Sequence, residues 1–353
     1  MPAQIADLWT PQIWVESMRE RQATFPALFN SGIVVSTDKM TEIATGAGTS
    51  ANVPFLKDIT DQTDEIQVEH VGPVTDNGQG GGLQNFPILN RVTKNSVTAL
   101  SAQVSGVDPM GAIIDQLTAR RLKQRQSTLV AMLRGVFGTG ATAANAAGAL
   151  SAVRLGGTAN EPFIEAGAQA NANYLIDPDK FIDASTLLGE LEDDLINGCI
   201  LCHPVIKGRL RKLDRLNFKT TVMQSELPWT IETYCGVPIF TSAALVRAGT
   251  GDGASGYVYD TYLMSKGTVG YGEKAQQGDT KDVASLQYFL DRDLNDDLIW
   301  DRTRFVLGIN GLKWVGNPGG QSATNAELQT AASWNLVYQT ANRVGVSCIR
   351  TNG

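Results

Sequence analysis

The most constraining feature of the sequence is one long helix, predicted over Asp108–Gly138. Asp108 is a typical N-cap residue, Pro109 suits the first helical turn, and Gly138 is a typical residue just past a helix end. Apolar side chains recur at helical spacing along this stretch. At 1.5 Å per residue the helix is about 45 Å long. We therefore expect the rest of the chain to be arranged around a spine-like helix.

A stretch rich in β-branched residues precedes this helix. Three segments are typical of strands, namely Ala51–Ile59, Glu65–Val71 and Phe86–Ser101, and the glycine-rich Gly72–Asn85 is expected to be a flexible tip. A long hairpin of this kind has little core of its own and is marginally stable alone. It must lie on another sheet of the same chain or on a neighbouring subunit.

The first 30 residues predict an arm that carries one helix, with Thr10 as its cap and Pro11 in its first turn. Large aromatic side chains on so short a segment must be buried, either on the same subunit or on a neighbour. These side chains are Trp9, Trp14, Phe25 and Phe29.

Beyond residue 138, helical and strand patterns mix without regular alternation, which favours an α+β fold over a doubly wound sheet. The predicted helices are Ala184–Leu195, Pro204–Leu216 and Ala326–Tyr338. The predicted strands are Cys199–Cys202, Thr230–Tyr234, Val237–Thr241, Tyr257–Ser265, two long strands within Leu286–Val315 that turn at Asn310–Gly311, and Gly345–Ile349.

Composition limits the function. The chain has 353 residues, 42% of them hydrophobic, which is enough for a sizeable core. A net charge of −7 argues against a basic nucleic-acid clamp. No run of 18 apolar residues predicts a membrane helix, and the first residues lack a secretory pattern. Two histidines are few for a metal or acid–base enzyme.

Cys199 to His203 match the pattern of c-type haem attachment. The match lies on a predicted apolar strand, where Cys199 and Cys202 point to opposite faces. Buried structural cysteines are the favoured interpretation, and a metal or redox pair is the alternative. A zinc site would need Cys235 or Cys348 from distant parts of the chain.

Other motifs fit structural roles better than chemical ones. Gly138–Ala143 matches a dinucleotide fingerprint but follows a helix, whereas that fingerprint needs a strand before it. Asp291–Asp297 resembles the start of a calcium loop but lacks its glycine and glutamate, which favours a polar turn between strands. Neither His70 nor His203 has a nucleophile elbow nearby. We expect no enzyme activity and no cofactor.

The middle of the long helix is strongly basic. Two interpretations remain open: a solvated face, or a weak and non-specific contact with nucleic acid. The residues concerned are Arg120, Arg121, Lys123 and Arg125.

Four segments, in order, resemble the major capsid proteins of tailed bacteriophages. The first three are the opening LWTPQIWVESMRERQATFPALFNSGIV, the strand-to-spine segment Arg91–Gly138, and CILCHPVIKGRLRKLDRL followed by IETYCGVPIFTSAAL. The fourth is LIWDRTRFVLGINGLKW. Together they cover most of residues 5–350.

This resemblance implies the Hong Kong 97-like capsid fold, which is α+β. The implied parts are an N-terminal arm at 1–50 and an extended loop at 51–97. A peripheral domain is implied at 98–185 and 286–316, and an axial domain with the C-terminal return at 186–285 and 317–353.

The resemblance also implies a function. The chain is expected to be a coat protein that self-assembles into hexamers and pentamers of an icosahedral head around double-stranded DNA, located in the virion and assembled in the host cytoplasm. Implied partners are a separate scaffolding protein, a portal and decoration proteins, with no membrane. An encapsulin-type bacterial nanocompartment shell of the same fold is the alternative. The candidate inter-subunit contacts are Trp9, Trp14, Phe25, Phe29, Lys57, Asn77, Gln79, Leu83 and Phe86.

Overall fold

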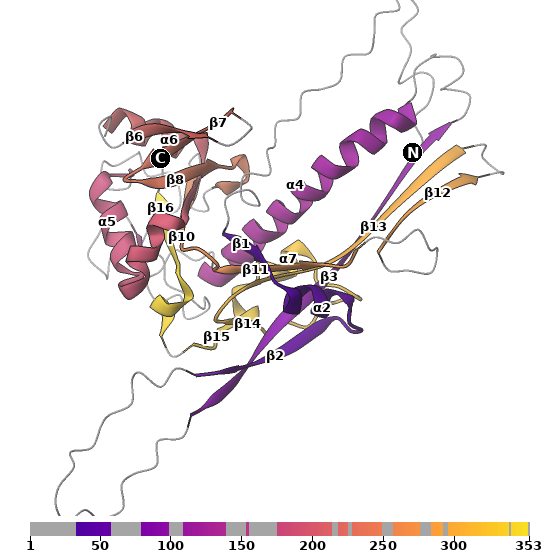
Figure 1. The fold of residues 1–353 in the computed structure, drawn as a ribbon, viewed down its shortest axis with the longest axis horizontal. Coiled ribbons are helices and arrows are strands. Elements are labelled where there is room, and N and C mark those ends of the chain that lie inside the picture. Colours follow the sequence, from indigo (N-terminus) through magenta and orange to yellow (C-terminus); the bar gives the residue numbers. More distant parts are fainter. Residues whose placement is uncertain are drawn as a thin grey trace, which may run out of the picture.

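A computed structural model provides the fold. The residues it describes are 33–57, 79–98, 109–138, 153–154, 175–213, 218–224, 228–248, 257–275, 284–291, 296–338 and 340–351. These residues form two main sheets, a small two-stranded sheet and one long helix (Figure 1). The predicted α+β class is confirmed.

The first sheet has six strands in the order β1-β11-β13-β3-β2, with β12 also paired to β13. Its longest strand, β3, pairs with β2 through its first part and with β13 through its second part. The strands are β1 (Val34–Ser36), β2 (Ser50–Leu56), β3 (Gly81–Thr98), β11 (Val269–Glu273), β12 (Ser285–Asp291) and β13 (Asp296–Ile309).

The second sheet has eight strands in the order β4-β16-β10-β5-β8-β7-β6, with β9 also paired to β10. These strands are β4 (Val153–Arg154), β5 (Cys199–Cys202), β6 (Phe218–Gln224), β7 (Pro228–Tyr234), β8 (Val237–Thr241), β9 (Val246–Ala248), β10 (Tyr257–Met264) and β16 (Val346–Thr351). The two-stranded sheet consists of β14 (Leu312–Trp314) and β15 (Trp334–Leu336).

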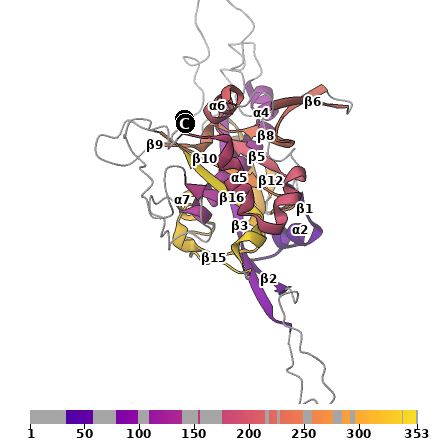
Figure 2. The same cartoon turned by 90° about the vertical axis from the view of Figure 1, so that its left-hand side faces the viewer.

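Helices cover and connect these sheets. The α-helices are α2 (Asp38–Thr45), α4 (Pro109–Phe137), α5 (Pro178–Thr186), α6 (Pro204–Leu213) and α7 (Asn325–Leu328). The 3₁₀ helices are η2 (Gly189–Asn197), η3 (Ala243–Leu245), η4 (Ala331–Ser333) and η5 (Ala341–Val344). Figure 1 shows α4 running diagonally beside β13 and β12, with α5 and α6 on the left-hand side, which Figure 2 turns toward the viewer.

The C-terminal half of α4 is the centre of the main core. Its side chains from Leu129 to Phe137 pack with residues of both large sheets, among them Leu89 of β3 and Phe305 of β13. The ring of Phe137 lies 5.7 Å from that of Tyr262 on β10. Burying one such side chain stabilises a fold by about 1.5–3 kcal/mol, so α4 joins the sheets mainly through the hydrophobic effect.

A buried ion pair reinforces the junction of α4 with the eight-stranded sheet. Arg350 of β16 donates from Nε to Oδ1 of Asp260 at 3.2 Å, and both side chains are almost fully buried. Its Nη2 donates to the carbonyl oxygens of Phe137 and Gly138, where α4 ends. A cation at a helix C-terminus is favourable because the last carbonyls have no partner inside the helix.

Arg304 plays the same role at the end of α2. This buried side chain on β13 donates from Nε to the carbonyl of Ala44 at 2.8 Å and from Nη2 to that of Gly48 at 3.0 Å. The contact fixes α2 against the six-stranded sheet.

Several sequence-based expectations about single elements are confirmed. The long helix begins and ends within one residue of the predicted bounds, and Gly138 has the left-handed φ of +67° that follows many helix ends. Strands β5 and β8 match their predicted ranges, and Asn310–Gly311 turns between strands. Asp291 pairs directly with Asp296, so this acidic segment joins two antiparallel strands.

Three expectations are wrong. The helix expected at Ala184–Leu195 is instead the end of α5 and the separate η2, which starts at Gly189 with a φ of +56°. The helix expected at Ala326–Tyr338 stops after one turn, because Trp334 pairs with Trp314 in the two-stranded sheet. Gly81–Asn85, expected within a flexible tip, belongs to β3 and pairs with β2.

A glycine on α4 is required by close packing. A Cβ at Gly135 would lie 2.1 Å from the carbonyl oxygen of Leu328 and 2.6 Å from Nε1 of Trp334. We therefore expect Gly135→Ala to lower the free energy of unfolding by about 2 kcal/mol, as overpacking does. Urea denaturation of the unassembled subunit measures the change.

Gly208→Ala on α6 is the matched control, since nothing lies within 4 Å of a Cβ there. Replacing this helical glycine should raise stability by about 0.5–1 kcal/mol. A Gly135→Ala subunit as stable as wild type would contradict the packing at this site.

Candidate assembly surfaces

The β2–β3 ribbon extends away from the rest of the described structure in both views (Figures 1 and 2). The two strands pair from Ser50↔Pro87 to Leu56↔Gly81. Gln84 anchors the ribbon by donating from Nε2 to the carbonyls of Ile309 and Leu312, each at 3.0 Å. Further out, Leu56 is 71% exposed and Leu83 58% exposed. The ribbon therefore offers apolar side chains that contribute little to the subunit's own core.

The predicted contact residues on this ribbon have different environments. Leu83 and Gln79 are exposed, and Lys57 is half-buried, with its backbone N–H donating to the carbonyl of Gly80 at 2.8 Å. The prediction is wrong for Phe86, which is 2% exposed and packs over Gly308 in the core of the subunit. The remaining candidates lie outside the described residues: Trp9, Trp14, Phe25, Phe29 and Asn77.

The basic centre of α4 is divided between two environments. Arg121 makes a two-pronged contact with Asp301 of β13, from Nε to Oδ2 at 3.0 Å and from Nη2 to Oδ1 at 2.8 Å. Arg125 pairs with Glu273 of β11 and lies over the ring of Tyr271. These two cations hold α4 on the six-stranded sheet, whereas Arg120 and Lys123 are exposed.

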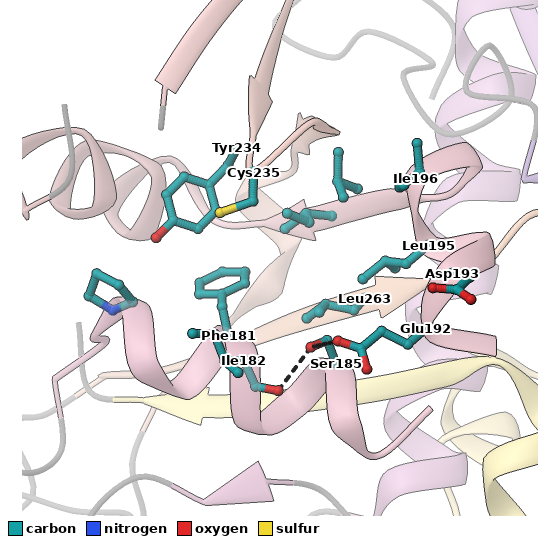
Figure 3. A pocket seen from close by; sticks show the side chains of 13 residues that line it. Phe181, Ile182, Ser185, Glu192, Asp193, Leu195, Ile196, Tyr234, Cys235 and Leu263 are labelled. Carbon is teal, nitrogen blue, oxygen red and sulfur yellow. Dashed lines mark hydrogen bonds between the residues drawn. The ribbon is translucent and has the colours of Figure 1, made fainter. Parts of the chain in front are cut away.

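A groove of about 410 Å³ lies over one face of the eight-stranded sheet (Figure 3). Its walls are α5, η2 and the turn at Cys235–Gly236, and Leu263 and Ile200 contribute to its lining. Ile182 and Ile196 line it and are 63% and 67% exposed. The carboxylates of Glu192 and Asp193 are also part of the lining. The groove is thus apolar inside and acidic at its edge.

Sequence reasoning missed this groove. Glu192, Asp193 and Asp194 fall within the predicted helix Ala184–Leu195, where no motif marks them as a site. A usable signal was present, because residues 175–197 contain seven acids and a single lysine, interleaved with isoleucine and leucine. Where exposed aliphatic side chains lie among charges of a single sign, a contact surface is favoured over a solvated helix.

The cysteines have structural environments. Cys199 packs in the main core with α4, whereas Cys202 packs on the opposite face of the sheet, below α5 and α6. Burial raises the pKa of the Cys202 thiol to about 12 and that of Cys199 well above its usual value. His203 accepts a hydrogen bond at Nδ1 from the N–H of Val205 at 3.2 Å, as a residue before a helix does. The predicted opposite faces are confirmed.

Metal clusters and membrane-spanning helices are both absent from the described residues. No group of three or more histidine, cysteine, aspartate or glutamate side chains among them is arranged to hold a metal ion. In the same part of the chain, no helix has the length and apolarity that a membrane crossing requires. His70 lies outside the described residues.

Known proteins of similar sequence and similar fold identify this architecture. The major capsid protein of Bacillus phage SPP1 is 24% identical over 343 residues, which cover 95% of this chain and 94% of that protein. The capsid of Ralstonia phage GP4 aligns over 98% of this chain and 94% of its own, with a TM-score of 0.54 and 11% identity. The chain has the fold of a tailed-phage major capsid protein. The predicted Hong Kong 97-like capsid fold is thereby confirmed.

The capsid of a native GTA particle has a similar fold: it aligns over 98% of this chain and 96% of its own, with a TM-score of 0.54 and 13% identity. No family model matches the chain. The encapsulin-type alternative is not favoured, since the sequence relative is a phage capsid protein. In a capsid fold of this kind, the ribbon, the exposed cations of α4 and the groove are the surfaces to consider.

The pair formed by Arg121 and Asp301 leads to a prediction about stability. Arg121→Met should lower the free energy of unfolding by about 2–3 kcal/mol, because the buried Asp301 carboxylate loses its cation. Arg120→Met is the control, since Arg120 is exposed and its loss should change stability by less than about 0.5 kcal/mol. Urea denaturation at pH 7 measures both, and equal effects would show that the contact is not stabilising.

The cysteine environments predict thiol reactivity. At pH 8 a soluble disulfide reagent should react quickly with one thiol per native subunit, that of the exposed Cys235, and with four after denaturation. Cys235→Ser should remove the fast reaction. Rapid reaction of Cys199 or Cys202 in the native subunit would support the redox alternative.

Proposed function

We propose that this chain is the major coat protein of a tailed double-stranded DNA phage. Copies of it assemble into hexamers and pentamers, and these form an icosahedral head that encloses the genome. The protein has a structural role. Its functional site is the set of surfaces that contact other copies, rather than a catalytic centre.

The observation that carries this proposal is the β2–β3 ribbon. A two-stranded ribbon is marginally stable in water, yet this one places Leu56 and Leu83 in solvent. Exposed aliphatic side chains on an extension are stabilised when another surface covers them. A neighbouring copy supplies such a surface at every position of a closed shell.

The net charge of the subunit is compatible with a shell that encloses DNA. A net charge of −7 prevents the shell as a whole from gripping the packaged genome. Exposed Arg120 and Lys123 on α4 provide a weak local attraction that does not depend on base sequence. Arg121 and Arg125 contribute less to such a contact, because carboxylates of the same subunit already pair with them.

Further partners follow from the same role. A separate scaffolding protein would set the size of the shell, a portal would occupy one vertex, and decoration proteins would bind outside. Assembly would take place in the host cytoplasm, and the mature protein would be found in the virion.

A nanocompartment shell of encapsulin type, which is not favoured, predicts different particle contents. The contents of particles purified from the native source distinguish the two roles. Phage DNA inside the particles supports the head, whereas a protein cargo without DNA supports the compartment.

The ribbon yields the direct test. Leu83→Asp combined with Leu56→Asp should leave the subunit folded, with an unchanged urea midpoint, because both side chains are exposed in the subunit. The same variant should form few or no shells in negative-stain electron microscopy. Val205→Asp, which alters an exposed aliphatic residue on α6, far from the ribbon in Figure 1, is the control and should assemble normally. Normal shells from the ribbon variant would refute the role of this surface.

A further inference from the structure

The end of the molecule that carries α5 and α6 has two patches of opposite charge. The first is the groove between α5, η2 and the turn at Cys235–Gly236 (Figure 3). The stretch that forms its α5–η2 wall has seven acids against Lys180, and Lys180 is itself 3.4 Å from Asp183. A surface of this composition attracts a cationic partner.

The second patch is the C-terminal end of α6, here called the basic tip and defined as Arg211, Lys212 and Leu213. The helix contains four cations and no acid. Lys207 and Arg211 contact Glu232 of β7, whereas Lys212 is exposed at the very end of the helix. Leu213 beside it is 50% exposed.

The two patches also match in their apolar parts. The groove of about 410 Å³ is lined by Ile182, Leu195 and Ile196, and it is large enough for an aliphatic side chain. Leu213 is such a side chain, and Lys212 next to it would lie at the acidic edge formed by Glu192 and Asp193. An apolar anchor with a charged rim is the usual anatomy of a protein interface.

Both patches are exposed in the single subunit, so they do not cover each other there. A contact between two copies could cover both. A contact between two different patches of the same chain is heterologous, and rotation about an axis closes it into a ring. Figure 2 shows α6 above α5, so the two patches are at separate places on the subunit and can meet different neighbours.

We propose that the basic tip of α6 in one copy inserts into the α5–η2 groove of the next copy around each capsomer ring. Leu213 fills the apolar groove, and Lys212 pairs with Glu192 and Asp193. This inference rests on the proposed coat function and identifies one of its interfaces.

The test exchanges the charges. Glu192→Lys with Asp193→Lys makes the groove basic, and Lys212→Glu makes the tip acidic. Each change alone should raise the subunit concentration needed for assembly by about fivefold or more, measured by light scattering, because every contact in the ring loses an ion pair. Both changes in one chain should restore assembly towards the wild-type threshold.

Matched controls separate this interface from net charge. Glu190→Lys with Asp194→Lys makes the same charge change on η2, but neither residue lines the groove. Lys266→Glu repeats the α6 change on the exposed turn after β10. Both controls should assemble at the wild-type concentration.

Mixing the two single-patch variants gives a sharper readout. Like copies repel, so the copies must alternate around a ring, which is possible with six members and impossible with five. The mixture should therefore form flat or tubular six-fold lattices in place of closed shells, as seen by electron microscopy.

The outcomes that would refute this interface differ from those that would refute the coat function. If wild-type protein forms no particles at all, the proposed function is wrong. If wild-type shells form and the groove and tip variants assemble as well as their controls, or the combined variant is not restored, the interface is wrong while the coat function stands.

Discussion

The antiparallel pairing of β3 with β13 is the interaction on which the rest of this structure depends. Its register runs from Asp296↔Thr98 to Val306↔Ile88. A one-residue slip would turn every side chain to the other face, moving Asp301 away from α4 and Phe305 out of the core. The same strand β3 continues into the ribbon with β2, so the direction of the ribbon is set by this register.

Buried charges then fix the long helix on this frame. Arg121 with Asp301 lies along α4, and Arg350 with Asp260 lies where the helix ends. Apolar packing alone tolerates sliding, because it is non-directional. A paired guanidinium and carboxylate in a buried site is satisfied in one geometry only, so these contacts define the position of the helix relative to both sheets. The placement of the ribbon and of the groove at opposite parts of the molecule follows from it.

The sequence predicted the elements whose signals are local. The glycine that ends α4, the apolar run of β5 and the break between strands at Cys235–Gly236 all depend on neighbouring residues, and the structure has them where the sequence predicts them. Thr324 and Glu327 form a capping box in the structure, but the helix after it ends after one turn. The pairing of Trp334 with Trp314 decides that end, and no local pattern reports a contact between distant strands.

The surfaces were harder to predict than the elements. Phe86 and Leu83 are both large apolar residues and lie three residues apart on one strand. Phe86 nevertheless packs over Gly308, whereas Leu83 is exposed to solvent. Both residues pair with β2, but an odd spacing along a strand turns their side chains to opposite faces, and only that of Phe86 faces the core. The groove required the relative placement of α5, η2 and a hairpin turn from a later part of the chain. Only the excess of acids near residues 175–197 was visible beforehand.

The size of these surfaces suits a shell that needs two kinds of ring. Five-membered and six-membered rings join the same patches at different angles, so a large rigid interface could satisfy only one of them. A single aliphatic anchor such as Leu213, with a salt bridge at the rim, tolerates a change of angle because its energy depends weakly on orientation. In the proposed shell each contact is then weak, but every subunit makes several, and their simultaneous engagement would give the closed shell its stability.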